Sequence, residues 1–178
     1  MKQRLLDQIA HFGPLPFERF MAEALYGDGG FFSSNELRSV KGGDFLTSPE
    51  VSTLFGETLA SFVRTEHGRI GEPFRLVEAG GGSGSLLRPL LADFPCEAWA
   101  VEASPAARGA LSALVGDEHV VAALGDLPVP FRGVVLANEL IDNLPMAIAQ
   151  MTGEGWRERW VGASEGELCF VDAPLRPE

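Results

Sequence analysis

The feature that most constrains the fold is a glycine-rich loop that directly follows a short apolar run. Residues 76–84 read LVEAGGGSG, and one carboxylate, Glu78, precedes the glycines. At the carboxyl end of a strand, glycines let the chain turn sharply and let a ligand approach the backbone closely. The stretch therefore predicts a strand, a ligand-binding turn and the start of a helix. A glycine turn with a purely structural role is the alternative.

Short apolar runs alternate with helical patterns on both sides of this loop. We predict four buried strands, and they lie within residues 74–79, 97–103, 119–124 and 131–139. Leucines at helical spacing follow the glycines, and Ser104-Pro105 is typical of a helix start. Alternation of strands and helices is typical of a parallel sheet with right-handed crossovers. The fold class predicted is α/β, a Rossmann-like parallel sheet.

The segments that flank this core follow other patterns. Residues 1–32 predict two helices separated by Gly13-Pro14, and three strand-like runs after Pro145 predict an antiparallel meander. A further helix is expected to start at Pro49 and to end at Gly68. We expect one compact domain with three parts. These are a helical extension with a cofactor-covering loop (1–72), a cofactor-binding core (73–145) and the meander (146–178).

Charge and composition restrict the class of partner. The chain has 25 acidic and 14 basic residues, so its net charge is -11. This charge repels phosphate backbones and disfavours nucleic acid as a partner, whereas it suits an Arg- or Lys-bearing protein. Solubility alone is the alternative role of the charge. Cys96 and Cys169 suggest neither a disulfide framework nor a metal site, so we expect a cytoplasmic location. No apolar run is long enough for membrane insertion.

A second acidic residue restricts the ligand further. Glu102 ends the second predicted strand, roughly 20 residues after the loop, where a carboxylate can accept hydrogen bonds from ribose hydroxyls. A solvated glutamate at a strand end is the alternative. The loop contains no lysine, and its spacing, E-x-G-x-G-x-G, differs from the dinucleotide pattern G-x-G-x-x-G. A positively charged ligand without phosphates, S-adenosylmethionine, fits these features best.

Four ordered motifs resemble the MidA family of class I methyltransferases, which includes the mitochondrial complex I assembly-factor arginine methyltransferase. The motifs are GPLPFERFMAEALY (13–26), GDFLTSPE (43–50), EAGGGSG (78–84) and NELIDNLP (138–145). Gly81 departs from the family pattern, which commonly has proline there. The resemblance implies methyl transfer from S-adenosylmethionine to a protein, with arginine as the favoured acceptor. A respiratory complex I subunit or another Arg-bearing protein is the implied substrate.

The motifs also imply roles for individual residues. The expected cofactor contacts are Glu78, Gly80, Gly82, Gly84, Glu102, Asp126, Asn138, Thr47 and Ser48. Glu139 and Asp142 are the expected catalytic residues, because carboxylates bind a guanidinium bidentately and can fix one nitrogen for attack. Local capping is the alternative role of Glu139, Asp142 and Ser48, and turn formation is the alternative role of Asp126.

Two other functions remain open, and so does the oligomeric state. A chain of this family could bind the cofactor without catalysis and serve as an interaction or assembly protein. A nicotinamide-dependent oxidoreductase is disfavoured by the glycine spacing. MidA-type proteins continue beyond the length of this chain with more sheet, so an open strand edge is expected here. We therefore expect self-association as a homodimer. Trp156 and Trp160, four apart on a predicted strand, are expected in the core.

Overall fold

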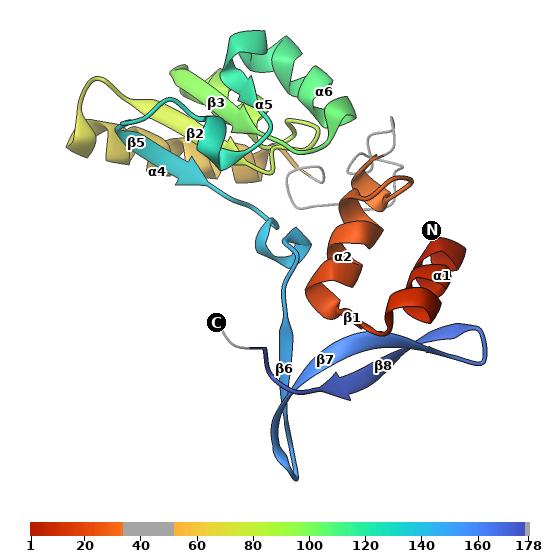
Figure 1. The fold of residues 1–178 in the computed structure, drawn as a ribbon. Coiled ribbons are helices and arrows are strands. Elements are labelled where there is room, and N and C mark those ends of the chain that lie inside the picture. The colour runs from red at the N-terminus through yellow and green to blue at the C-terminus, as the bar shows by residue number, and fades with distance from the viewer. Residues whose placement is uncertain (34–51, 177–178) are drawn as a thin grey trace. The chain divides into compact units, whose positions relative to one another are not determined.

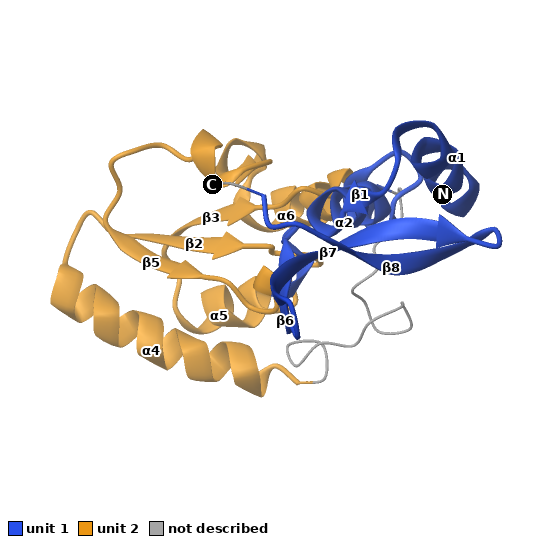
Figure 2. Cartoon of the chain, turned by 60° about the horizontal axis from the view of Figure 1, so that its bottom comes forward, with its two compact units in different colours: residues 1–33, 142–178 blue, residues 34–141 orange. Residues whose placement is uncertain are grey.

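The computed structural model describes residues 1–33 and 52–176. Two compact units make up the chain: residues 1–33 with 142–178, and residues 34–141 (Figure 2). We refer to them as unit 1 and unit 2. Each unit is defined by the contacts among its residues in the folded chain. The bounds of the two units therefore differ from those of the three segments expected from the sequence.

Unit 2 contains the parallel sheet that the sequence predicts. Its strands are β2 (Arg75–Ala79), β3 (Glu97–Val101), β4 (Val120–Val121) and β5 (Gly133–Leu136), in the order β4-β3-β2-β5 (Figure 1). Every neighbouring pair is parallel. The central strand β2 pairs Glu78 with Ala100 on one side and with Leu136 on the other. The carboxyl ends of β2, β3 and β5 therefore lie at the same edge of the sheet.

Three helices cover one face of this sheet. They are α4 (Leu54–Ile70), α5 (Leu87–Asp93) and α6 (Pro105–Val115). Their apolar side chains form one core with alternate residues of the strands; its fully buried members are Ala60, Val63, Leu76, Leu87, Leu90, Ala100 and Leu111. Burying each leucine or valine side chain contributes about 1.5–3 kcal/mol, and each alanine contributes less. This core fixes the loop between β2 and α5, because both neighbours of the loop belong to it.

The predicted limits of α4 are wrong. The helix was expected to run from Pro49 to Gly68, whereas α4 runs from Leu54 to Ile70. Residues 52 and 53 are not helical, and the Oγ of Ser52 accepts a hydrogen bond from the N–H of Leu54, where α4 begins. The helix continues past Gly68 to Ile70, and Gly71, at φ 73°, ends it. Glycine adopts this left-handed conformation without steric cost. Pro49 and its predicted cap Ser48 lie outside the described residues.

The opposite face of the sheet has no helix among the described residues of unit 2. Val77, Val101 and Leu127 form a small core there, with Trp99 and Phe131 packed against it. The chain between β4 and β5 supplies this cover, through the 3₁₀ turn Leu124–Asp126 and the residues after it. Val135 on β5 is 50% exposed. The two faces of the sheet are thus covered very unequally.

Unit 1 combines the two ends of the chain. Helices α1 (Lys2–Phe12) and α2 (Phe17–Tyr26) flank the short strand β1 (Leu15–Pro16), and the 3₁₀ turn Phe31–Ser33 follows. The predicted meander is confirmed as β6 (Ile148–Thr152), β7 (Gly155–Ser164) and β8 (Glu167–Ala173), all antiparallel. β1 also pairs with β7. Leu5, Ile9, Leu15 and Val161 form the core of this unit.

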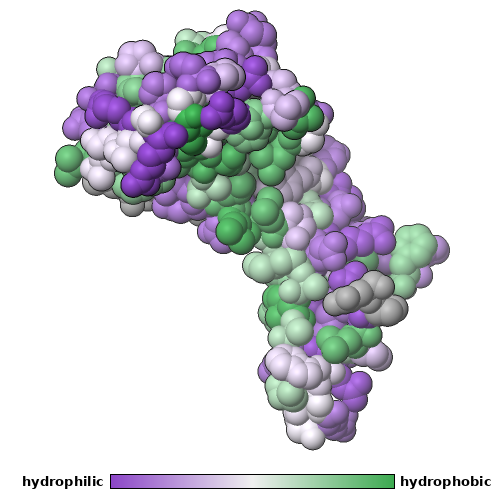
Figure 3. All heavy atoms as spheres, turned by 90° about the vertical axis from the view of Figure 1, so that its left-hand side faces the viewer, coloured by the Kyte–Doolittle hydropathy of each residue, from purple (hydrophilic) through white to green (hydrophobic). Residues whose placement is uncertain are grey.

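One tryptophan of unit 1 departs from the expected core position. Trp156 is 55% exposed, because it lies beside the turn between β6 and β7, where its cross-strand partner is Met151, itself 57% exposed. Figure 3 shows hydrophobic residues among hydrophilic ones on one face of the molecule. Within residues 1–33 and 52–176, no helix combines the length and the apolar character needed to cross a membrane.

Candidate cofactor site at the glycine-rich loop

Hydrogen bonds and backbone conformation define the loop after β2. The N–H of Gly80 donates to the carbonyl oxygen of Val101 at 2.8 Å, and the N–H of Gly84 donates to that of Gly81 at 2.9 Å. Gly80, Gly82 and Gly84 have φ angles of 74°, 52° and 76°. Residues other than glycine rarely adopt positive φ angles. The conformation of the loop therefore depends on glycine at these three positions.

The four glycines differ in what surrounds them. A Cβ on Gly80 would lie 2.9 Å from the Cδ1 of Leu140, and one on Gly81 would lie 3.1 Å from both Cδ atoms of Leu111. Gly84 is 3.4 Å from Leu111 by the same measure. Among the described residues, a Cβ on Gly82 would meet nothing within 4 Å. Gly80 and Gly81 therefore permit close packing, whereas Gly82 faces space that the described residues leave open and in which a ligand could contact the backbone.

Glu102 holds this loop from the neighbouring strand. Its Oε2 accepts a hydrogen bond from the N–H of Gly82 at 2.9 Å, and its Oε1 accepts one from the N–H of Ser104 at 2.7 Å. The Nη1 of Arg108 donates to the carbonyl oxygen of Glu102 at 3.0 Å. Each carboxylate oxygen has a second lone pair, so Glu102 can still accept hydrogen bonds from a ligand. Glu102 thus lies beside Gly82, and its role as a ribose contact stays a prediction.

Glu78 lies beneath the same loop, on the helix-covered face of the sheet. It is only 3% exposed, and its Oε2 has no hydrogen-bond partner among the described residues. The pKa of Glu78 is raised to about 8, mainly by burial and in part by the negative charge of Glu102. The Oε2 atom would be 3.5 Å from a Cβ on Gly81. A buried carboxyl group under these conditions holds a proton near neutral pH.

The segment after β5 reaches the same edge of the sheet. Asn138 and Glu139 follow that strand, and Leu140 packs against Gly80. Glu139 is exposed and has a φ of 51°, which is uncommon for a residue other than glycine. Such strained residues cluster at functional sites, and this one lies beside the glycine loop.

The other predicted site residues are distributed differently. Asp142 is exposed in the 3₁₀ turn Ile141–Asn143 and belongs to unit 1. Asp126 is exposed, and its Oδ2 accepts a hydrogen bond from the N–H of Ala123 at 3.1 Å, which is turn chemistry. Thr47 and Ser48 lie outside the described residues. Unit 2 thus brings together Glu78, Gly80, Gly82, Gly84, Glu102, Asn138 and Glu139.

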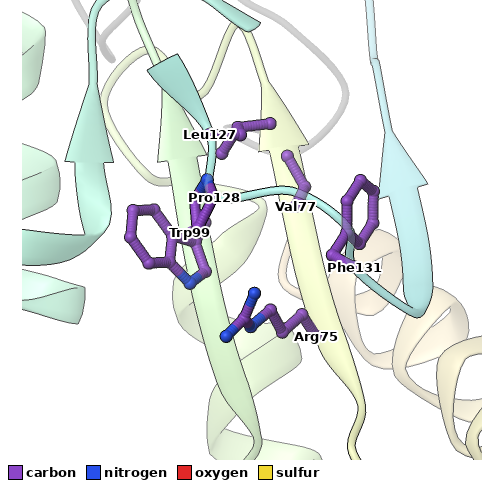
Figure 4. A pocket seen from close by; sticks show the side chains of 6 residues that line it. All are labelled: Arg75, Val77, Trp99, Leu127, Pro128 and Phe131. Atoms are coloured by element: carbon purple, nitrogen blue, oxygen red, sulfur yellow. The ribbon is translucent and has the colours of Figure 1, made fainter. Parts of the chain in front are cut away.

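A shallow depression elsewhere in unit 2 is a different feature. It lies on the face of the sheet opposite the three helices, and its lining residues are Arg75, Val77, Trp99, Leu127, Pro128 and Phe131 (Figure 4). Its volume open to water is about 0 Å³, so it cannot enclose a ligand. The described residues also contain no cluster of three or more His, Cys, Asp or Glu side chains that could hold a metal ion.

The site residues suit a nucleoside that carries a positive charge. The backbone at Gly82 is left open by the described residues, Glu102 has carboxylate oxygens that can accept hydrogen bonds, and two carboxyl groups lie next to a loop without lysine. Residues 55–178 match a family described as "Putative S-adenosyl-L-methionine-dependent methyltransferase". The chain belongs to this family, whose cofactor is S-adenosylmethionine.

The relatives include animal proteins and solved bacterial structures. The protein arginine methyltransferase NDUFAF7 of Danio rerio is 30% identical, and the alignment covers 95% of this chain and 49% of that protein. The human protein of the same name, also mitochondrial, is 29% identical over 98% of this chain and 48% of its own length. This chain therefore spans about half the length of the curated relatives it matches.

A crystal structure from Burkholderia thailandensis, bound to S-adenosyl-homocysteine, has the same fold. It is 32% identical to this chain with a TM-score of 0.81, and the match covers 99% of this chain and 50% of that one. The class I methyltransferase fold predicted from the sequence is confirmed by this likeness.

The sequence did not predict that Leu140 and Leu111 shape the loop, because nothing in their local pattern distinguishes them from other leucines.

Proposed function

We propose that this chain binds S-adenosylmethionine at the Gly82 loop and carries the cofactor half of an enzyme that methylates arginine in a protein. One observation carries the proposal: in a member of this family, Gly82 faces open space beside the carboxylate of Glu102. Arginine as acceptor is supported by the names of the animal relatives. The net charge of -11 also favours a basic protein segment as the substrate.

The cofactor, when bound, supplies a methyl group on a sulfonium, and its transfer is an in-line displacement that depends on positioning. We assign the ribose hydroxyls to the free lone pairs of Glu102. We assign the acceptor guanidinium to Glu139, since a carboxylate fixes its orientation. Asp142, which belongs to unit 1, stays a predicted catalytic residue. Asn138 remains a proposed cofactor contact, as does Asp126.

The Gly82→Val variant tests the position of the ligand. Its branched side chain would fill the open space at the loop, so we expect binding of S-adenosyl-homocysteine to be lost in isothermal titration calorimetry. Gly71→Val is the matched control, because Gly71 also has a positive φ and nothing within 4 Å of its Cβ direction. The control should bind normally. Normal binding by a folded Gly82→Val variant would contradict the proposed site.

The Glu102→Ala variant tests the ribose contact. Loss of a charge-assisted acceptor should cost about 1.5–3 kcal/mol, or roughly 10- to 150-fold in affinity for S-adenosyl-homocysteine. The same change removes an acceptor from the N–H of Gly82, so circular dichroism must first show that the variant is folded. Unchanged affinity in the folded variant would exclude Glu102 from the site.

The Glu139→Gln variant separates acceptor binding from cofactor binding. We expect nearly unchanged affinity for S-adenosyl-homocysteine and a sharp loss of methyl transfer to an arginine peptide, at least tenfold. Glu118→Gln is the control, because the side chain of Glu118 is 75% exposed on a different segment of unit 2. Equal loss of cofactor affinity and transfer would mean that Glu139 serves the cofactor instead.

A cofactor-binding protein without catalysis is the second candidate. Binding of S-adenosyl-homocysteine without any transfer to arginine peptides or protein would support it. Binding of NAD in the same titrations would instead support the disfavoured oxidoreductase.

A further inference from the structure

Two carboxyl groups lie close together under the glycine loop of unit 2. Glu102 is fixed by the N–H groups of Gly82 and Ser104. Glu78 is buried, and its Oε2 has no hydrogen-bond partner among the described residues. An unpartnered, buried carboxyl group in a native structure calls for an explanation, because its burial costs free energy.

Among the described residues, no cation is recorded as a partner of the Glu78 carboxyl group. Of the described residues, Glu102 is the ionisable group whose charge acts on Glu78, and it opposes ionisation. Arg108, from α6, directs its Nη1 to the backbone oxygens of Glu102 and Ala103, not to either carboxylate. The helices α4 and α5 contribute apolar side chains to the core on this face. A positive charge that enters the site would therefore be the partner that Glu78 lacks.

We propose that Glu78 is a proton-coupled specificity residue, which releases its proton to solvent when a ligand with a positively charged sulfonium binds at Gly82. The step converts the neutral carboxylic acid into a carboxylate and one solvated proton, and no other bond changes. The site then favours the cationic methyl donor over S-adenosyl-homocysteine, whose sulfur is neutral. This inference rests on the proposed binding of that cofactor and adds a charge-dependent preference to it.

Calorimetry in buffers of different ionisation enthalpy tests the proposal, because the apparent binding heat then reports the number of protons released. At about pH 7 the wild-type protein should release close to one proton with S-adenosylmethionine and far fewer with S-adenosyl-homocysteine. At about pH 9, where Glu78 is already ionised, the release with the sulfonium should largely disappear. The sulfonium lowers the pKa of the ligand's amino group, so the comparison is repeated at about pH 6, where that amino group is protonated in both ligands and Glu78 is still neutral.

The Glu78→Gln variant should remove the difference in proton release between the two ligands and reduce the preference for the sulfonium at least tenfold. Glu118→Gln, at an exposed position, should behave like the wild type. Should Glu78→Gln fail to fold, the wild-type comparison at these pH values decides alone. Binding of both ligands with equal proton release would overturn the inference and leave the proposed function intact. Binding of neither ligand would overturn the proposed function itself.

Discussion

Glu78 links the stability of unit 2 to pH, because its carboxyl group is buried in the folded state and solvated in the unfolded state. Its pKa is raised from 4.5 to about 8, so the folded state favours the protonated form. The stability contributed by this protonated form is present below about pH 4.5. It is lost as pH rises toward 8, and little changes above that value.

We expect the wild-type protein to lose about 2–3 kcal/mol of unfolding free energy between pH 6 and 9 through this group. Glu78→Gln, which cannot ionise, should lack this loss and should be the more stable protein at pH 9. Urea unfolding at several pH values measures both quantities. Parallel pH profiles for the two proteins would show that Glu78 is not the group responsible.

The sequence identified the residues of the loop but not their separate tasks. The spacing of Glu78, the glycines and Glu102 was sufficient to predict a nucleoside site, since it depends on local chain geometry. The contrast between Gly80, which accommodates Leu140, and Gly82, which faces open space, depends on a segment far along the chain. Local patterns carry no information about such a contact.

At the level of elements, the pairing of β5 with β2 depends on one glycine at the start of β5. A Cβ on Gly133 would lie only 1.7 Å from the carbonyl oxygen of Arg75, its direct partner in the sheet. No rearrangement of a side chain can relieve a clash with backbone, so the strands would have to separate.

We therefore expect Gly133→Ala to destabilise unit 2 by more than about 3 kcal/mol, in the range of the severe single substitutions. Thermal and urea unfolding give the measurement. Gly125→Ala is the control, because a Cβ there would meet nothing within 4 Å. A small effect at Gly133, similar to that at Gly125, would show that β5 tolerates displacement.

Element types followed from the sequence more reliably than element limits and pairings. The strands of unit 2 and the meander were predicted because apolar alternation and turn residues are local properties. The end of α4 was placed too early because an internal glycine resembles a helix end, whereas the left-handed conformation that ends the helix occurs at Gly71. The pairing of Leu15 with Val161 had no local signal, since β1 has only 2 residues.

At the scale of the whole molecule, β5 forms one edge of the parallel sheet, and its outer side has no partner strand among the described residues. Among the described residues, β5 pairs with β2 alone, and the meander pairs with β1 instead of extending this sheet. An unpaired strand edge offers N–H and C=O groups to another chain. We infer that two copies associate through this edge, in line with the homodimer expected from the sequence.

Sedimentation at micromolar concentration should give a mass of about twice 19.1 kDa. The Val135→Lys variant changes a half-exposed residue of β5 and should shift the protein toward the monomer. The Val129→Lys variant is the control and should not, because Val129 lies outside the strands and is 81% exposed. A clean monomer in the wild type would contradict the dimer.

The cytoplasmic location stays a prediction, and the animal relatives are named as mitochondrial proteins.

The pairing of β1 with β7 also orders the events of biosynthesis. Helices α1 and α2 are translated well before their core partner Val161 and before β7, the strand that pairs with Leu15. The described strands of unit 2 lie between Arg75 and Leu136, so all of them are translated before Val161. Because contacts between distant residues must await both partners and carry the larger loop-closure entropy, α1 and α2 acquire their native neighbours after the strands of unit 2 have been synthesised.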